Sequence, residues 1–187
     1  MTKNRKNGGF SLIEMMCTLL ILVILVMGIG VGMDAGMRIY RDATFESESA
    51  TLAGILNTSL GDILRYSLDV RETTDEEKAE HGSNVEFVFT SIDYGIQDAY
   101  FYIPPHVDGG AKGPVQMKSM RKDGYIVELV NTGAYPDLVV YDFEITYSPR
   151  VAPGIQGGYF EIEYWISSES DPSKTRHVET IVRIMND

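Results

Sequence analysis

The chain has 187 residues, which leaves room for one membrane-spanning helix and one domain of about 150 residues but not for two globular domains. The formal net charge of −11 is unevenly spread: the first nine residues carry +3, Glu14 adds −1, and the residues from 34 onward carry −13. An acidic domain lacks the clustered Lys and Arg that drive nucleic-acid binding, so we do not expect DNA as a partner. The single cysteine, Cys17, excludes an intramolecular disulfide.

A basic start is followed directly by a long apolar run. The 24 residues from Phe10 to Met33 contain one formal charge, that of Glu14. At 1.5 Å per residue they form a helix of about 36 Å, enough to cross a hydrocarbon core of about 30 Å. Positive flanks stay on the cytoplasmic side, so we expect the acidic C-terminal part to be exported. The basic residues before the run are Lys3, Arg5 and Lys6.

Glu14 is the unusual residue of this run, because a charge at the centre of a spanning helix costs about 2.5 to 3.5 kcal/mol, and somewhat less near its end. We expect its partner to come from the chain terminus or from another molecule. If the chain were cut after Gly9, Phe10 would carry a new ammonium group four residues before Glu14. A like helix offset by about one turn would bring its own Glu14 level with that ammonium. The sequence leaves open whose ammonium Glu14 meets.

The start of the chain resembles a known signature. The short basic leader, the residues Gly9-Phe10-Ser11-Leu12-Ile13-Glu14 and the apolar helix are similar to the type IV prepilin signature of type IV pilins and of the pseudopilins of secretion and competence systems. This resemblance implies cleavage between Gly9 and Phe10 by a prepilin peptidase, N-methylation of Phe10, and a role for Glu14 in assembly. A secretory signal peptide or a plain signal anchor is the alternative. The apolar run is longer than the usual core of a signal peptide and no convincing small-x-small cleavage site follows it, while a plain anchor gives no reason for Gly8-Gly9 or for Glu14.

The helix is expected to continue beyond the apolar run. No proline occurs before Pro104, so one helix can extend from about Ser11 to about Leu68. Four glycines weaken its middle and favour either close helix packing or a hinge, which the sequence leaves open. Further on, apolar residues recur at helical spacing and predict a buried stripe. The glycines are Gly28, Gly30, Gly32 and Gly36, and the stripe is Leu52, Ile55, Leu56, Leu60, Ile63 and Leu64.

Residues 71–84 are polar, and we expect a solvated loop with at most one helical turn, in which Asp75, Glu76 and Glu77 form a solvated run rather than a metal site. The chain then changes to period two, which predicts an antiparallel meander of about five or six strands laid across the helix. The expected strands are Val85 to Phe89, Ala99 to Ile103, Tyr125 to Val130, Leu138 to Tyr147, Tyr159 to Ile166 and Val178 to Met185.

No constellation of catalytic residues emerges. His81, His106 and His177 lie in separate segments without ligand spacing, and nucleophile elbows, phosphate loops and zinc motifs are absent from the sequence. We therefore expect no enzymatic activity, no small-molecule substrate, no cofactor and no metal site. Calcium is the one ion with any basis, because Asp108-Gly109-Gly110 and the loop Ser168 to Asp171 place oxygen ligands near turns, although neither has the spacing of a calcium loop.

The predicted protein is α+β, with a long N-terminal helix, half membrane-spanning and half amphipathic, packed on an antiparallel sheet as the pilin resemblance implies. Its parts are a cleaved cytoplasmic leader (1–9), a transmembrane or filament-core helix (10–33), its amphipathic continuation (34–69) and an exported β-sheet domain with a connecting loop (70–187).

The predicted function is that of a structural subunit of a type IV pilus-like filament. The acidic domain without cysteine favours a minor pilin or pseudopilin, located in the cytoplasmic membrane and in an extracytoplasmic filament. The expected partners are the membrane, other subunits, the prepilin peptidase and the assembly platform. A single-pass anchor carrying an extracytoplasmic binding domain or enzyme is the alternative.

Overall fold

The structure is a computed structural model of the chain, and it describes residues 11–81, 85–104, 112–121, 125–130, 132–149 and 158–185. The chain divides into two compact units. The first, Met1–Thr44, contains the apolar part of one long helix. The second, Phe45–Asp187, contains the rest of that helix and every strand of the described residues. The predicted α+β class is confirmed.

The long helix α1 (Leu12–Arg65) is continuous over 54 residues, as the absence of proline and the helical spacing predict. It ends before the expected end near Leu68, because Ser67 already begins β1 (Ser67–Glu72) and lies opposite Ser91 of the next strand. The Ser67 hydroxyl donates a hydrogen bond to the carbonyl oxygen of Leu64 at 2.8 Å. That bond satisfies one of the carbonyls which a helix end leaves open.

Within the second unit, one stripe of α1 lies at the centre of the hydrophobic core. Leu56, Leu60 and Leu64 are almost completely buried, and the predicted stripe is confirmed except at Ile55, which is 40% exposed. The facing strand β8 (Tyr159–Ser168) places Tyr164 against the helix, where its hydroxyl donates to Asn57 Oδ1 at 2.9 Å. Burial raises the pKa of this phenol, so Tyr164 remains a neutral donor.

The first sheet is antiparallel and has five strands in the order β1-β2-β3-β5-β6. The short helix α2 (Asp75–His81) lies between β1 and β2 in the chain, so the expected helical turn in this polar segment is confirmed. β3 ends at Tyr102, just before Ile103-Pro104, as expected because proline has no N–H to donate to the hydrogen bonds between strands. The remaining strands are β2 (Phe87–Ser91), β3 (Ile96–Tyr102), β5 (Gln116–Ser119) and β6 (Ile126–Glu128).

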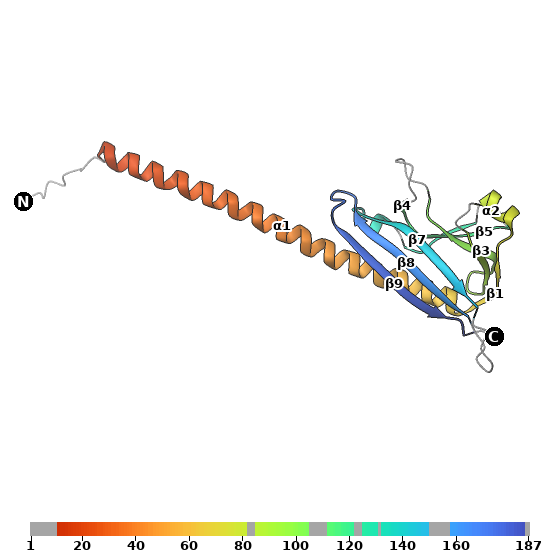
Figure 1. Cartoon of the computed structure of the whole chain (residues 1–187). Coiled ribbons are helices and arrows are strands. Elements are labelled where there is room, and N and C mark those ends of the chain that lie inside the picture. The colour runs from red at the N-terminus through yellow and green to blue at the C-terminus, as the bar shows by residue number, and fades with distance from the viewer. Residues whose placement is uncertain are drawn as a thin grey trace, which may run out of the picture. The chain divides into compact units, whose positions relative to one another are not determined.

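The second sheet has four strands in the order β4-β7-β8-β9, and Figure 1 shows β7, β8 and β9 side by side. Along β8 the even-numbered residues are buried towards the core, while Glu161 and Glu163 point away, as the period of two predicts. Its other strands are β4 (Lys112–Gly113), β7 (Leu138–Ser148) and β9 (Thr175–Arg183), and a short 3-10 helix η1 (Thr132–Ala134) precedes β7.

The prediction of a single meander was wrong, because the strands form two sheets. The chain changes sheets between β4, which pairs with β7, and β5, which pairs with β3. Pro114 lies at this change and has no N–H to continue a ladder. Three strands that the sequence did not predict, β1, β4 and β5, are short or polar, so their period of two carries little signal.

Candidate functional site

The predicted cleavage and methylation residues, Gly9 and Phe10, lie outside the described residues, and the described chain begins at Ser11. Ser11 is the N-cap of α1. Its backbone N–H donates to Glu14 Oε2 at 3.0 Å, and the N–H of Glu14 donates to Ser11 Oγ at 3.3 Å. This reciprocal pair is a capping box, in which two backbone donors at the start of the helix are satisfied.

The capping box supplies a partner that the sequence reasoning dismissed, because Ser11 was expected to offer only a weak hydrogen bond. We expected the Glu14 carboxylate to find a partner only at the chain terminus or on another molecule, but Ser11 of the same chain binds one of its oxygens. The signal was present, because Ser followed three residues later by Glu is the usual capping-box pattern. Oε1 of Glu14 accepts no hydrogen bond among the described residues, so it is open to a further donor.

Cleavage before Phe10 would leave this arrangement intact. Ser11 would become the second residue of the shortened chain and would keep an amide N–H, so both capping hydrogen bonds would persist. The carboxylate would then stay directed towards the start of the helix, where the new ammonium group of Phe10 would lie. A carboxylate there is also favoured by the helix dipole, by about 0.3 to 1 kcal/mol.

The first turns of α1 expose an apolar surface on every side. The large apolar side chains from Leu12 to Met33 are between 42% and 81% exposed. The helix is long and apolar enough to cross a membrane, with a mean hydropathy of 2.7 in an 18-residue window near the N-terminus. An apolar surface of this size is stable only when lipid or protein covers it.

The four glycines of this region lie within unbroken α-helix. A Cβ atom added at Gly28, Gly30, Gly32 or Gly36 would meet no heavy atom within 4 Å. Nothing else in the described chain therefore requires glycine at these positions. Both interpretations, close packing against another helix and a hinge, stay predictions.

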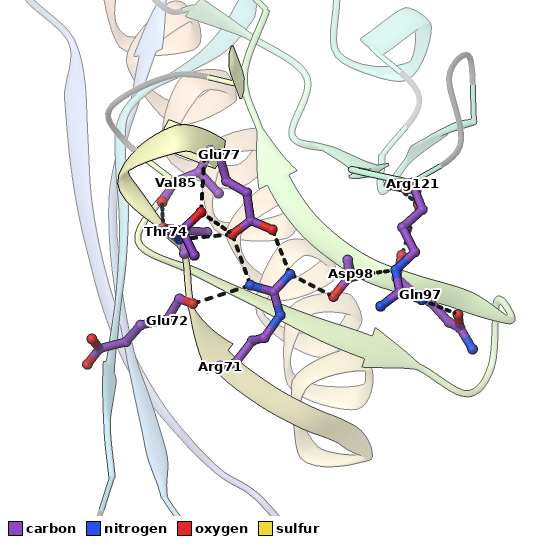
Figure 2. A network of polar contacts seen from close by, with 10 residues as sticks. Arg71, Glu72, Thr74, Glu77, Val85, Gln97, Asp98 and Arg121 are labelled. Carbon is purple, nitrogen blue, oxygen red and sulfur yellow. Dashed lines mark hydrogen bonds and ion pairs between the residues drawn. The ribbon is translucent and has the colours of Figure 1, made fainter. Parts of the chain in front are cut away.

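A network of ion pairs fastens α2 to the five-stranded sheet (Figure 2). Arg71 donates to both carboxylate oxygens of Glu77, at 2.9 and 2.7 Å, and its Nη2 lies 3.1 Å from Asp98 Oδ1. Asp98, whose side chain is 12% exposed, also accepts a hydrogen bond from Arg121 Nε. Arg121 in turn donates through Nη1 to Gln97 Oε1 at 3.1 Å. Charges thus alternate in sign from Glu77 to Arg121.

The network fixes the ionisation of its members. Hydrogen bonds from Arg71 lower the pKa of Glu77 from its ordinary 4.5 to about 2, and the same contacts raise the pKa of Arg71. The sequence interpretation placed Glu77 in a solvated run with Asp75 and Glu76, and it was wrong for Glu77. The contact of Arg71 with Asp98 could not be found from local sequence, because Asp98 lies 27 residues beyond Arg71.

The other candidate residues are distributed over the fold. His81 lies against Tyr100 at a ring-centroid distance of 5.8 Å, His177 stacks on Trp165 at 4.5 Å, and His106 lies outside the described residues. Within the described ranges, no group of three or more His, Cys, Asp or Glu residues is arranged to hold a metal ion.

The two segments considered for calcium have different outcomes. Residues 108–110 lie outside the described part of the chain. In the Ser168 to Asp171 loop, oxygens of Asp137 accept hydrogen bonds from the Ser168 hydroxyl at 2.8 Å and from the Ser170 N–H at 2.9 Å. Although burial opposes the charged form, these bonds lower the pKa of Asp137. The carboxylate thus serves as the anchor of the loop between β8 and β9.

Comparison with known families finds one match. The model of the prokaryotic N-terminal methylation motif matches residues 4–30, the segment that includes Gly9, Phe10, Ser11 and Glu14. This motif is the hallmark of type IV prepilin-type proteins, the pilins and pseudopilins, so the resemblance noted in the sequence is confirmed. No curated protein and no solved structure matches the chain.

The motif and the apolar helix together support a membrane-anchored, type IV pilin-like precursor that a prepilin peptidase processes and that assembles with other pilin subunits. The motif points to a structural pilin-type protein, a class whose members are usually non-enzymatic.

Proposed function

We propose that this chain is a minor pilin or pseudopilin, a structural subunit that enters a type IV pilus-like filament through its N-terminal helix. The observation that carries the proposal is the start of α1. There an apolar helix without cover in its own chain begins with a capping box that directs Glu14 towards the cleavage site. Cleavage between Gly9 and Phe10 would add an ammonium group one residue before this capping box.

The finer assignment to a minor pilin or pseudopilin rests on the exported unit. Cys17 lies in α1, so no cysteine is available for a disulfide in the acidic domain. The ion pairs of Arg71 with Glu77 and Asp98 hold α2, the segment between the long helix and the second strand, against the five-stranded sheet. In this proposal the subunit crosses the cytoplasmic membrane once, its β-sheet domain lies outside, and it needs neither substrate nor cofactor.

The first experiment tests maturation. Replacing Gly9 with a bulky residue, Gly9→Leu, should leave the leader attached, because the peptidase needs an unhindered backbone at the cleavage site. Intact-mass measurement of the membrane form distinguishes the two states, since the mature chain loses residues 1–9 and gains a methyl group on Phe10. Loss of the leader from Gly9→Leu as rapidly as from the wild-type chain would contradict the assignment to a prepilin peptidase.

The second experiment tests assembly. Glu14→Ala should insert into the membrane and export its domain normally but fail to enter filaments. Subunit amounts are compared by immunoblot in membranes and in sheared filaments. Wild-type chain absent from every filament fraction, or Glu14→Ala present at the wild-type level, would refute the structural role. The amount relative to the major component then separates a minor pilin from a principal subunit.

A further inference from the structure

One end of the five-stranded sheet carries a groove that the filament proposal has not used. The groove has a volume of about 380 Å³ and lies where β3 begins and β5 ends. Tyr94 and Tyr125 line it together with Gln97, Ser119 and Arg121. Among the described residues that line the groove, aromatic and amide groups accompany one cation, Arg121, so the groove combines apolar surface with hydrogen-bond donors.

Arg121 is held in place for binding. Its Nε donates to Asp98 and its Nη1 donates to Gln97, which fixes the guanidinium plane (Figure 2). Its Nη2 has no hydrogen-bond partner among the described residues, and its side chain is 65% exposed. Because Asp98 is shared with Arg71, Arg121 is the cationic end of the network as far as the described residues extend, and its Nη2 can donate to a carboxylate.

The surroundings of the groove indicate a protein partner. Ile92, just before the lining residues in the sequence, and Ile126, just after them, are each more than half exposed. Exposed isoleucine beside Tyr and Arg is typical of protein interfaces, where aromatic residues and Arg supply most of the binding energy. The groove therefore fits a protein surface that offers a carboxylate with apolar residues beside it.

The outer face of the second sheet of this same chain is such a surface. The strand register places Glu144, Glu163 and Glu179 opposite one another on β7, β8 and β9. Like charges directly opposite destabilise a sheet. Only Glu163 has a basic partner among the described residues, the ring of His177 at 2.7 Å. Ile181, two residues along β9 from Glu179, is largely exposed.

We propose that the groove around Arg121 in one copy binds the row Glu144–Glu163–Glu179 of a second copy. The inference rests on the proposed function, in the form in which copies of this chain lie next to one another in one filament. The two surfaces are different, so the contact is heterologous. Repetition of a heterologous contact that does not close into a ring produces an open helical assembly. The pairing also supplies the cation that Glu144 and Glu179 lack.

Cross-linking of the full chain in assembled filaments tests the contact. Ile92→Cys lies beside the groove and Ile181→Cys beside the acidic row, and the exported unit has no cysteine of its own. A short bis-maleimide linker should convert the double variant into a ladder of multimers, whereas each single variant should give dimers at most. The parent chain, with Cys17 alone, measures background. Ile92→Cys with Glu76→Cys on α2 is the matched control.

A double-mutant cycle tests the charges independently. Arg121→Gln, which keeps a donor for Asp98, and Glu144→Gln with Glu179→Gln should each lower filament incorporation about threefold to fivefold, the size of one exposed ion pair. Their combination should be no worse than either alone, because both remove the same interaction. Glu76→Gln with Glu80→Gln removes two exposed charges elsewhere and should leave incorporation unchanged.

The outcomes separate this inference from the proposed function. Normal filaments without a ladder, an equal ladder from the Glu76→Cys control, or additive losses in the cycle would overturn the contact while the filament role stands. A parent chain that enters no filament would overturn both.

Discussion

The capping box makes a prediction that separates two roles of Glu14. Glu14→Gln keeps the acceptor for the Ser11 N–H and its own backbone N–H, so it retains both hydrogen bonds and loses only the charge. Glu14→Ala loses the charge and the side-chain acceptor. Ser11→Ala loses the hydroxyl acceptor for the Glu14 N–H and keeps the carboxylate. Glu14→Gln therefore removes the charge alone, Glu14→Ala removes the charge and the side-chain acceptor, and Ser11→Ala removes part of the cap alone.

The expected magnitudes differ by far more than measurement error. Loss of an N-cap costs about 0.5 to 2 kcal/mol, so Ser11→Ala should reduce filament incorporation by roughly thirtyfold or less. An ammonium and a carboxylate 4 Å apart interact by about 4 kcal/mol at an effective dielectric constant of 20. Loss of that pair corresponds to roughly a thousandfold. We therefore expect Glu14→Gln and Glu14→Ala to be similarly defective, and Ser11→Ala to assemble.

The assay is incorporation into sheared filaments, quantified relative to the membrane pool of the same cells. Membrane insertion serves as the control, because removal of a charge from an apolar helix should leave insertion unchanged or improve it. If Glu14→Gln assembled like the wild type while Glu14→Ala did not, the cap rather than the charge would be the functional feature. Ser11→Ala failing as completely as Glu14→Ala would support the same conclusion.

Three further predictions concern the folded domain. Leu60→Ala should lower the free energy of unfolding by about 2 to 5 kcal/mol because Leu60 is fully buried, whereas Ile55→Ala on the same helix should lower it far less. Denaturant unfolding in detergent measures both. Asp98 has φ of 48° and accepts hydrogen bonds from Arg71 and Arg121, so Asp98→Ala, which tolerates this φ poorly and removes the acceptor, should be less stable than Asp98→Asn by at least about 1 kcal/mol in the same assay, and equal values would refute both contributions. The pKa of Glu77 is lowered from 4.5 to about 2, so its contribution is complete above pH 4.5 and is lost as the pH falls towards 2; amide exchange in α2 should accelerate over that range in the wild type, and persistence of this acceleration in Glu77→Gln would contradict the assignment.

The parts of the fold that the sequence predicts are those with long, regular patterns. α1 has no proline and repeats its apolar residues at helical spacing, and its stripe lies in the core as predicted. β8 alternates from Phe160 to Ile166, and its inner residues are buried. In both elements the local pattern and the tertiary environment agree, which is why pattern alone was sufficient.

The features that escaped prediction depend on contacts distant in sequence. Ile55 fits the helical stripe, yet no strand covers it, and only the arrangement of the sheets decides that. The division into two sheets rests on β4 pairing with β7 and β5 pairing with β3, each through few residues. The Arg71–Asp98–Arg121 network joins residues more than twenty positions apart. The capping box is different, because its pattern was local and readable from Ser11 and Glu14.

The apolar run and Glu14 contribute to assembly in different ways. Burial of one large apolar side chain yields about 1.5 to 3 kcal/mol, so the residues from Leu12 to Met33 together supply tens of kcal/mol to any apolar environment that covers them. That term is non-directional, and it would be nearly the same if one helix slid along its neighbour. Glu14 weakens the burial slightly. If its carboxylate meets the ammonium group of a neighbouring subunit, as we propose, the charge is satisfied only at one axial offset. In that arrangement the carboxylate fixes register where the apolar residues fix only location, and Glu14→Gln should insert at least as well as the wild type and still fail to assemble.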